Sequence, residues 1–315
     1  MFIKCLKETY MYNGVINVYK EPGFTSFDVV AKLRGILKQK KIGHTGTLDP
    51  DAEGVLVVCL GKATKLCETL TDKDKSYEAT LLLGKTTDTE DSSGKILTET
   101  KVYATEKEVE EAILSFVGEY DQIPPMYSAI KVNGKKLYEL AREGIEIERK
   151  PRRVVIHSIE ILSMELPYVK MKVSCGKGTY IRSLCRDIGE KLGCGGIMDK
   201  LVRSSVNATE TGKVFTAKDA LRLEEIEMLT ENGTISEKIL PVDSLFPLCN
   251  KYKVTEDGNK KLMNGNILKS RDFEGDSPAK EEGKVCLVYD MEGNFTATYQ
   301  YRSDMKGWKA DKMFL

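Results

Sequence analysis

Six apolar residues in succession, Val55 to Leu60, constrain the fold of this chain more than any other segment. A strand with one face in water alternates apolar and polar residues, whereas a strand covered on both faces is apolar throughout. The run therefore predicts a strand that is buried on both faces. The glycine-punctuated segment before it, Gly43 to Gly54, predicts a loop that leads into this strand.

The rest of the chain mixes predicted strands and helices without strict alternation. Thr25 and Thr105 each have an acidic residue three positions later, a pattern that predicts helix starts, the second helix running to about Gly118. The polar, acidic segment 86–95 is predicted to be an exposed loop. Residue spacing predicts further elements, namely strands over 76–83, 152–162 and 168–173 and helices over 135–142 and 179–192. This mixture favours an α+β fold over a doubly wound sheet.

The two ends of the chain differ from its middle. From Asn250 onward short strands and turns predominate, with a hairpin predicted over 284–301. We therefore expect a large domain over residues 1–249 and a small β-rich domain over residues 250–315. Residues 1–11 are a candidate upstream extension of a chain that begins at Met11.

Composition limits the classes of function. Lys+Arg and Asp+Glu both number 48, so an RNA-binding surface would have to be a local basic patch. No run of about 18 apolar residues predicts a membrane span, and the N-terminus lacks the pattern of a signal peptide, so we expect a cytoplasmic protein. The eight cysteines are scattered without a Cys-x-x-Cys pair, and there are two histidines, so we expect buried reduced thiols and no metal site.

Two common catalytic motifs fit the sequence poorly. Gly84-Lys85-Thr86 suggests a phosphate-binding loop, but Ala79 stands where that motif needs a glycine. A hydrolytic triad would have to recruit His44 or His157, and neither lies near a candidate serine in the sequence. The remaining groups for chemistry are carboxylates, tyrosines and arginines, and we expect no cofactor.

The loop before the buried strand has the sequence GHTGTLDP from Gly43 to Pro50. Its glycines permit backbone conformations that other residues resist, and Pro50 biases Asp49 toward an extended conformation that limits where its carboxylate can point. A stiffened turn beside a buried strand is a good platform for one positioned group. An isolated Asp-Pro pair is more often an ordinary turn, so the assignment of Asp49 depends on the longer pattern.

The segment Gly43–Pro50, followed by Ala52, Gly54 and Val55, closely resembles the signature of the bacterial tRNA pseudouridine synthase B family, which converts uridine 55 of tRNA. The resemblance implies the pseudouridine-synthase fold, a mixed and largely antiparallel central sheet flanked by helices, with a small PUA-like RNA-binding domain at the C-terminus. Other family motifs follow in family order over residues 12–205: Gly14–Lys20, Gly23–Ser26, Lys75–Tyr77, Pro124–Ala129, Gly178–Leu184 and Leu201-x-Arg203.

For catalysis, the resemblance implies three residues. Asp49 matches the catalytic carboxylate, Arg182 the arginine that pairs with it, and Tyr77 the tyrosine that stacks on the target base and assists proton removal from carbon 5. A carboxylate suits the reaction because breaking the N-glycosidic bond develops positive charge at the sugar. Whether Asp49 attacks the sugar, attacks the base or abstracts a proton from the sugar stays open. By spacing alone, Tyr77 would be a core residue and Arg182 a surface residue.

Four further residues match substrate-binding positions of the family. Tyr180 and Leu201 align with residues that line the pocket of the flipped uracil. His44 aligns with a histidine that contacts the extruded base stack, and Lys20 with a lysine near the start of the family pattern. This chain has Lys20-Glu21-Pro22 where the family commonly has proline directly after the lysine.

Residues from about 124 to 153 include the densest basic stretch of the chain. In the family this region is an insertion that closes over the T-loop, so we expect contact with the T-stem-loop of tRNA. We expect a monomer with no obligatory protein partner and no membrane contact. Two other hypotheses are an RNA-binding protein without activity and a guide-RNA-dependent rRNA synthase, whose relatives share the loop and need partner proteins.

Overall fold

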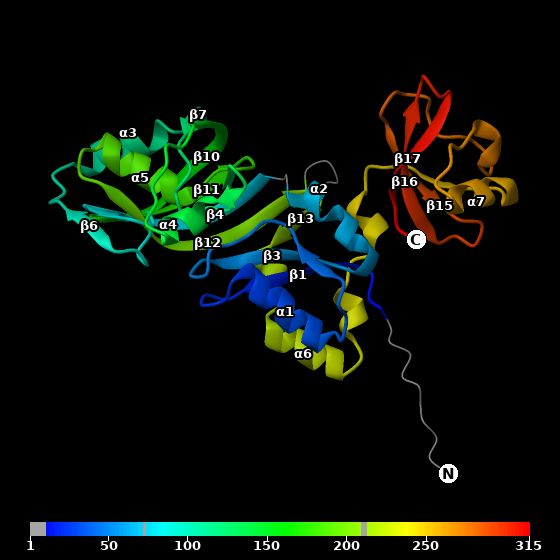
Figure 1. Ribbon diagram of the computed structural model, residues 1–315, viewed down its shortest axis with the longest axis horizontal. Helices are drawn as coiled ribbons and strands as arrows, with labels where there is room; N and C mark the ends of the chain where they lie inside the picture. The colour runs from blue at the N-terminus through cyan, green and yellow to red at the C-terminus, as the bar shows by residue number, and fades with distance from the viewer. Residues whose placement is uncertain (1–10, 72–73, 209–212) are drawn as a thin grey trace, which may run out of the picture.

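The strand predicted from the apolar run lies inside the larger of two main sheets (Figure 1). The computed structural model describes residues 11–71, 74–208 and 213–315, so nearly all of the expected N-terminal extension lies outside the described residues. Strand β3 (Glu53–Leu60) pairs with β1 (Gly14–Lys20) on one side. On its other side, β3 meets β12 (Gly196–Ala208) in a short parallel contact.

The large sheet is mixed and mostly antiparallel, as predicted. Its order is β1-β3-β12-β4-β11-β10-β7, and the β12–β3 contact is its parallel pair. Because β12 pairs along its length with β4 and meets β3 at only two residues, β12 joins the two halves of the sheet. The other strands are β2 (Ile42–His44), β4 (Asp74–Leu83), β7 (Gly118–Gln122), β10 (Arg152–Glu165), β11 (Tyr168–Cys175) and β13 (Lys213–Thr216).

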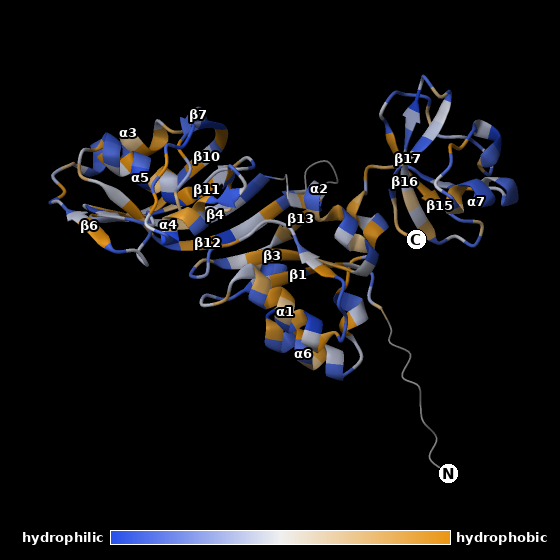
Figure 2. Cartoon of the chain, viewed as in Figure 1, coloured by the Kyte–Doolittle hydropathy of each residue, from blue (hydrophilic) through white to orange (hydrophobic). Residues whose placement is uncertain are grey.

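Both faces of β3 are covered, which confirms the prediction from its sequence. Leu56, Val58 and Leu60 share a core with helices α1 (Ser26–Ile36) and α6 (Leu223–Glu231). The alternate residues of β3 face the opposite core, which includes residues of η1 (Gly61–Leu66), α2 (Cys67–Thr71) and η5 (Val242–Leu245). Figure 2 shows hydrophobic residues concentrated along β1, β3 and α1.

The second half of the sheet is covered by two other helices, α3 (Glu106–Leu114) and α5 (Ile181–Lys191), whose apolar residues share a core with β4, β10 and β11. Two short hairpins extend from this half. One comprises β5 (Lys85–Thr87) and β6 (Ile96–Glu99). The other comprises β8 (Lys131–Val132) and β9 (Lys135–Lys136), followed by α4 (Leu137–Arg142), and it belongs to the predicted insertion.

The predicted helix starts at Thr25 and Thr105 are confirmed, and both carry complete capping boxes. The helix after Thr105 ends at Leu114 with Ser115 as its C-cap, earlier than predicted, and Gly118, with a φ of +109°, already begins β7. The prediction of an exposed loop over 86–95 is wrong in part. The carboxylate of Glu90 is buried there because Arg186 pairs with it and the hydroxyl of Ser183 donates to it at 2.7 Å.

The C-terminal residues form a separate four-stranded sheet, which Figure 1 shows at one end of the molecule. The sheet packs around buried Trp308 and Tyr299, and its docking to the larger part includes Phe314, whose ring lies in the core beneath β3. The β-rich C-terminal domain is thus confirmed. No helix in the described ranges is long and apolar enough to cross a membrane. The elements are β14 (Lys251–Lys253), α7 (Glu256–Met263), β15 (Val285–Tyr289), β16 (Phe295–Arg302) and β17 (Gly307–Met313).

Candidate active site

Asp49 lies in the loop between β2 and β3, and hydrogen bonds fasten the part of this loop that precedes it. The amide of Thr45 donates to the carbonyl of Val57 at 3.0 Å. The amide of Leu48 donates to the buried hydroxyl of Ser26, at the start of α1, at 2.9 Å. Leu48, the residue before Asp49, is therefore bound to the start of α1. This contact restricts the backbone from which the Asp49 carboxylate extends.

Two glycines, Gly46 in the loop and Gly54 at the start of β3, are required by the geometry of this region. Gly46 has a φ of +86°, a backbone conformation that L side chains rarely adopt. Gly54 has a φ of +107°, and a Cβ atom there would lie 2.3 Å from the carbonyl oxygen of Arg203. The loop can therefore pass this closely to β12 only because residue 54 is glycine.

Lys20 lies beneath the loop with its side chain fully buried. Its ammonium group donates to the carbonyls of Pro50 at 2.9 Å and Glu21 at 3.1 Å, and also to that of Ala52. Burial lowers the pKa of Lys20 to about 8, and the charge of nearby Asp49 opposes this shift. Because its ammonium group donates hydrogen bonds to backbone carbonyls around Asp49, Lys20 stabilises the turn that carries Asp49. It does not face solvent.

Arg182, in the first turn of α5, lies against Asp49 although 133 residues separate them. Its Nε is 3.0 Å from Oδ2 of Asp49 and its Nη2 is 3.2 Å from Oδ1, a bidentate pair. The guanidinium also donates to the carbonyls of Tyr127 at 2.8 Å and Thr89 at 3.1 Å, and lies 3.7 Å from the carboxylate of Asp91. Arg182 is thus a buried residue, contrary to what its spacing suggests, and is held from several sides.

The environment of Asp49 raises the pKa of its carboxyl group above the ordinary value. Burial is the largest cause, and the negative charge of Asp91 adds to it, whereas Arg182 opposes both. The side chain nevertheless keeps 37% of its surface exposed. It is therefore desolvated on its protein side and still reachable by a substrate.

Tyr77 and Arg203 lie directly opposite each other in the β4–β12 pair. Both are buried, and the guanidinium of Arg203 lies close enough to the Tyr77 phenol to affect its pKa. Arg203 also donates to the carbonyls of Val55 at 2.7 Å and Gly46 at 3.1 Å. Burial raises the pKa of Tyr77 to about 12, and the charge of Arg203 counteracts this rise. The cation of Arg203 thus stands beside the phenol of Tyr77 and favours its ionised form.

Leu201 lies two residues before Arg203 on β12, and the buried core that contains Leu201 also contains Tyr77 and Leu48. Tyr180 precedes α5, and its backbone is held by the Gln122 side chain through hydrogen bonds of 2.8 and 3.0 Å. Burial raises the pKa of the Tyr180 phenol. Leu201 and Tyr77 therefore form an apolar wall on the strands β12 and β4, and Tyr180 is an aromatic residue at the start of α5.

His44 ends β2, five residues before Asp49, and is half-buried. Burial and the charge of Arg203 lower the pKa of its imidazole, so the ring is neutral at pH 7. The predicted residues Lys20, His44 and Tyr77 come from β1, β2 and β4, three strands of the same large sheet. Arg182 and Tyr180 come from α5 and the residue before it.

Three residues of this site were not predicted from the sequence: Asp91, Arg203 and Gln122. Arg203 belongs to the Leu-x-Arg motif, which could have singled it out. Asp91 lies in a segment that looked like an exposed acidic loop, and only its distance to Arg182 reveals it. Gln122 has no sequence signal because its role consists of contacts with Tyr180, 58 residues away.

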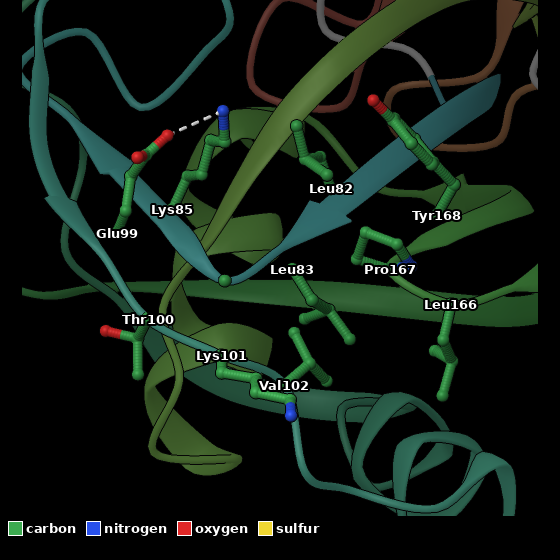
Figure 3. A pocket seen from close by; sticks show the side chains of 11 residues that line it. Leu82, Leu83, Lys85, Glu99, Thr100, Lys101, Val102, Leu166, Pro167 and Tyr168 are labelled. Atoms are coloured by element: carbon green, nitrogen blue, oxygen red, sulfur yellow. Dashed lines mark ion pairs between the residues drawn. The ribbon is translucent and has the colours of Figure 1, made fainter.

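A hollow of about 520 Å³ lies elsewhere, between the end of β4 and the β10–β11 turn (Figure 3). Leu83, Val102 and Pro167 line it, with the Lys85–Glu99 ion pair at its edge. None of the predicted site residues lines this hollow, so we do not assign it to the active site. Within the described ranges, no cluster of His, Cys, Asp or Glu residues is suited to hold a metal ion.

Two family models match adjacent parts of the chain. Residues 34–181 match the TruB family pseudouridylate synthase (N terminal domain), and residues 182–247 match the tRNA pseudouridylate synthase B C-terminal domain. A solved structure with the same fold is the crystal structure of a Cbf5-Nop10-Gar1 complex. It has a TM-score of 0.69 and 26% identity, and the match covers 96% of this chain and 85% of that one.

Curated relatives match over nearly the whole chain. The tRNA pseudouridine synthase B of Lachnoclostridium phytofermentans is 56% identical over 312 residues, which are 96% of this chain and 100% of the relative. The enzyme of the same name from Clostridium kluyveri is 49% identical over 282 residues, which are 90% of this chain and 93% of the relative. On this evidence the chain belongs to the tRNA pseudouridine synthase B family and has the pseudouridine-synthase fold.

Proposed function

We propose that this protein converts uridine 55 in the T-loop of tRNA into pseudouridine, with Asp49 as its catalytic carboxylate. As a member of the tRNA pseudouridine synthase B family it is a tRNA pseudouridine synthase, an intramolecular isomerase. The proposal adds the position in tRNA, the flipped base and the residues that act. The reaction requires no cofactor, because the uracil is detached and rejoined within one active site.

The observation that carries the proposal is the bidentate Asp49–Arg182 pair. Arg182 orients the carboxylate, and burial raises the pKa of Asp49, which makes the charged group more reactive than it would be in water. Positive charge that develops at the sugar during cleavage of the N-glycosidic bond would be stabilised by such a group. The geometry is compatible with attack on the sugar, attack on the base and proton abstraction alike.

The target base would stand between the Leu201 and Tyr77 wall and Tyr180. Base-flipping enzymes hold an extruded base between aromatic and apolar side chains, and this arrangement supports that role. Tyr77 would take the proton from carbon 5, a step that the neighbouring Arg203 charge would assist. Half-buried His44, at the end of β2 beside the loop, would contact the bases left behind.

The rest of the tRNA would be held by two outlying parts of the protein. The insertion at about 124–153 contacts the active site, because Arg182 donates a hydrogen bond to the carbonyl of Tyr127 in this insertion. The β-rich domain over residues 250–315 would contact RNA beyond the T-loop. We further propose a catalytic domain over residues 1–249 and a cytoplasmic monomer that acts without an obligatory protein partner. The 56% identity to a tRNA pseudouridine synthase B favours this hypothesis over a guide-RNA-dependent enzyme.

The test is to incubate the purified protein with unmodified tRNA transcripts and to map pseudouridine chemically. The wild-type protein should modify position 55, and Asp49→Asn should abolish conversion while tRNA affinity stays largely intact. Asp51→Asn is the matched control, because Asp51 is an exposed carboxylate in the same turn and should remain active. Tight tRNA binding without pseudouridine would instead support an RNA-binding protein, and full activity of Asp49→Asn would exclude the assigned role.

A further inference from the structure

Phe27 places a large aromatic ring in solvent beside the active-site loop. It is 71% exposed, and the other phenylalanines of the described ranges are buried or half-buried. Single exposed apolar side chains are common on protein surfaces and carry no meaning by themselves. The position of this one relative to Asp49 is what calls for an explanation.

Two contacts fix that position. Phe27 follows Ser26, whose hydroxyl accepts the hydrogen bond from the amide of Leu48, so the first turn of α1 is bound to the residue before Asp49. The Phe27 ring also contacts the imidazole of His44, with ring centroids 5.7 Å apart and ring planes at 86°. Phe27 and His44 therefore form an aromatic pair that is anchored next to the catalytic loop.

The shape and charge of this pair suit a planar, uncharged ligand that belongs to an anionic chain. Perpendicular rings form a corner, in which a base can lie with its face on one ring and its edge against the other. The exposed face of α1 continues from Phe27 through Ala31 to Arg34 at helical spacing. Arg34, exposed and bonded at 3.4 Å to the Ile42 carbonyl, adds a cation where a phosphate would follow such a base.

We propose that Phe27 is a further RNA-contacting residue, which stacks on an unpaired base of the RNA substrate other than the target uridine, beside the contact already proposed for His44. The inference rests on the proposed function and extends it, because it assigns a contact to Phe27 and names the ligand class. Proteins recognise RNA loops by stacking their splayed bases on aromatic side chains. The fold does not need the Phe27 ring in its core, and the ring lies beside the loop that carries Asp49.

The test measures equilibrium binding of an unmodified T-stem-loop RNA by the full chain carrying Asp49→Asn, so that no turnover occurs. Adding Phe27→Ala should weaken binding about tenfold, the typical effect of removing one base–aromatic stack. Phe27→Trp should bind within about twofold of the reference, and Phe27→Leu should resemble Phe27→Ala, because leucine keeps an apolar side chain without a stacking face. Tyr103→Ala is the matched control, since Tyr103 is an aromatic residue that is 80% exposed outside the site, and it should leave affinity unchanged.

A second measurement identifies the base. The loop nucleotides other than the target are replaced one at a time by abasic ones, and at one position Phe27→Ala should no longer weaken binding, because the stacking partner is already gone. Unchanged affinity in Phe27→Ala, or a loss that no abasic position removes, would overturn the proposal. The two hypotheses fail separately. A wild-type protein that makes no pseudouridine at position 55 refutes the proposed function, whereas an active wild type with an unaffected Phe27→Ala variant refutes only the stacking contact of Phe27.

Discussion

Arg182 lies between two carboxylates, and the two have opposite effects on the site. The bidentate contact with Asp49 orients that carboxylate and favours its charged form. Asp91, 3.7 Å from the same guanidinium, repels the charge of Asp49 and raises its pKa. The ionised fraction of Asp49 at a given pH therefore depends on a residue that need not touch the substrate.

This arrangement predicts the pH dependence of the Asp91→Asn variant. A raised pKa means that Asp49 becomes protonated, and activity falls, at a higher pH than for an ordinary aspartate with a pKa of 3.8. Removing the negative charge of Asp91 lowers the pKa of Asp49, so the acid limb of the single-turnover rate profile should move to lower pH. Asp88→Asn, an exposed carboxylate in the same segment, should leave the limb in place. An unchanged or upward-shifted limb in Asp91→Asn would contradict this electrostatic role.

Tyr77 and Arg203 are a second coupled pair of residues. A phenol with a pKa of about 12 is a poor proton acceptor at pH 7, and the adjacent guanidinium is the group that favours its ionised form. If Tyr77 takes the proton from carbon 5, as proposed, then Arg203 acts on that step through Tyr77. Arg203 is a positioning residue in this sense, and it also holds the Gly46 carbonyl of the loop.

We predict non-additive losses for this pair. Arg203→Gln should slow single-turnover conversion about 100-fold, in the range of one general acid–base contribution. Arg203→Lys should recover part of the rate, because it keeps the charge but not all of the hydrogen bonds. Tyr77→Phe combined with Arg203→Gln should be little slower than the slower single variant, since both substitutions remove the same step. Fully additive losses would show that the two residues act independently.

At the scale of secondary-structure elements, the site depends on how closely the Asp49 loop approaches β12. Gly54, the second residue of β3, faces the backbone of Arg203, where a Cβ atom would lie 2.3 Å from a carbonyl oxygen. Gly233 has a similar positive φ of +76° but nothing within 4 Å of the Cβ position. A side chain at Gly233 would therefore cause backbone strain alone, whereas a side chain at Gly54 would cause both backbone strain and a steric clash.

The comparison predicts different costs for the same substitution. Gly233→Ala should lower the free energy of unfolding by about 1 kcal/mol through backbone strain alone. Gly54→Ala should cost about 3 kcal/mol or more, because β3 and β12 must also move apart. Denaturant unfolding of both variants measures the difference, and the surviving folded Gly54→Ala protein should also have lost activity. Equal losses of stability would show that the loop can move away from β12 at little cost.

The elements were more predictable from sequence than the contacts among them. Local signals predicted β3 through its apolar run and α1 and α3 through their capping boxes, because these signals act within a few residues. The burial of Arg182 and the role of Asp91 arise where α5 packs against a segment about 90 residues earlier. Spacing cannot show such a contact, so the acidic segment looked like an exposed loop. The resemblance to a family supplied Arg182, whereas Asp91 emerged only from the structure.

At the scale of the whole molecule, contacts that include Phe314, near the C-terminus, join the β-rich domain to the larger part. Phe314, 4% exposed, packs with Phe295 at a centroid distance of 5.3 Å and shares a core with Val242 and Leu245 of the larger part. Lys65 adds a hydrogen bond of 2.6 Å to the Met313 carbonyl. These contacts fix the β-rich domain relative to the active site, which matters if both parts hold one tRNA.

Phe314→Ala should therefore affect a long RNA more than a short one. Removing the ring opens the interface, so the connecting segment before β14 should be cleaved faster in limited proteolysis. Affinity for full-length tRNA should fall severalfold, because a loosened β-rich domain loses conformational entropy when it binds the tRNA together with the larger part. Affinity for an isolated T-stem-loop, which engages the larger part alone, should change little.

Leu248→Ala, an exposed residue of the same connecting segment, is the control and should alter neither affinity. Equal losses for both RNAs would instead place the defect in the active site, and the β-rich domain would then have no separate part in holding tRNA.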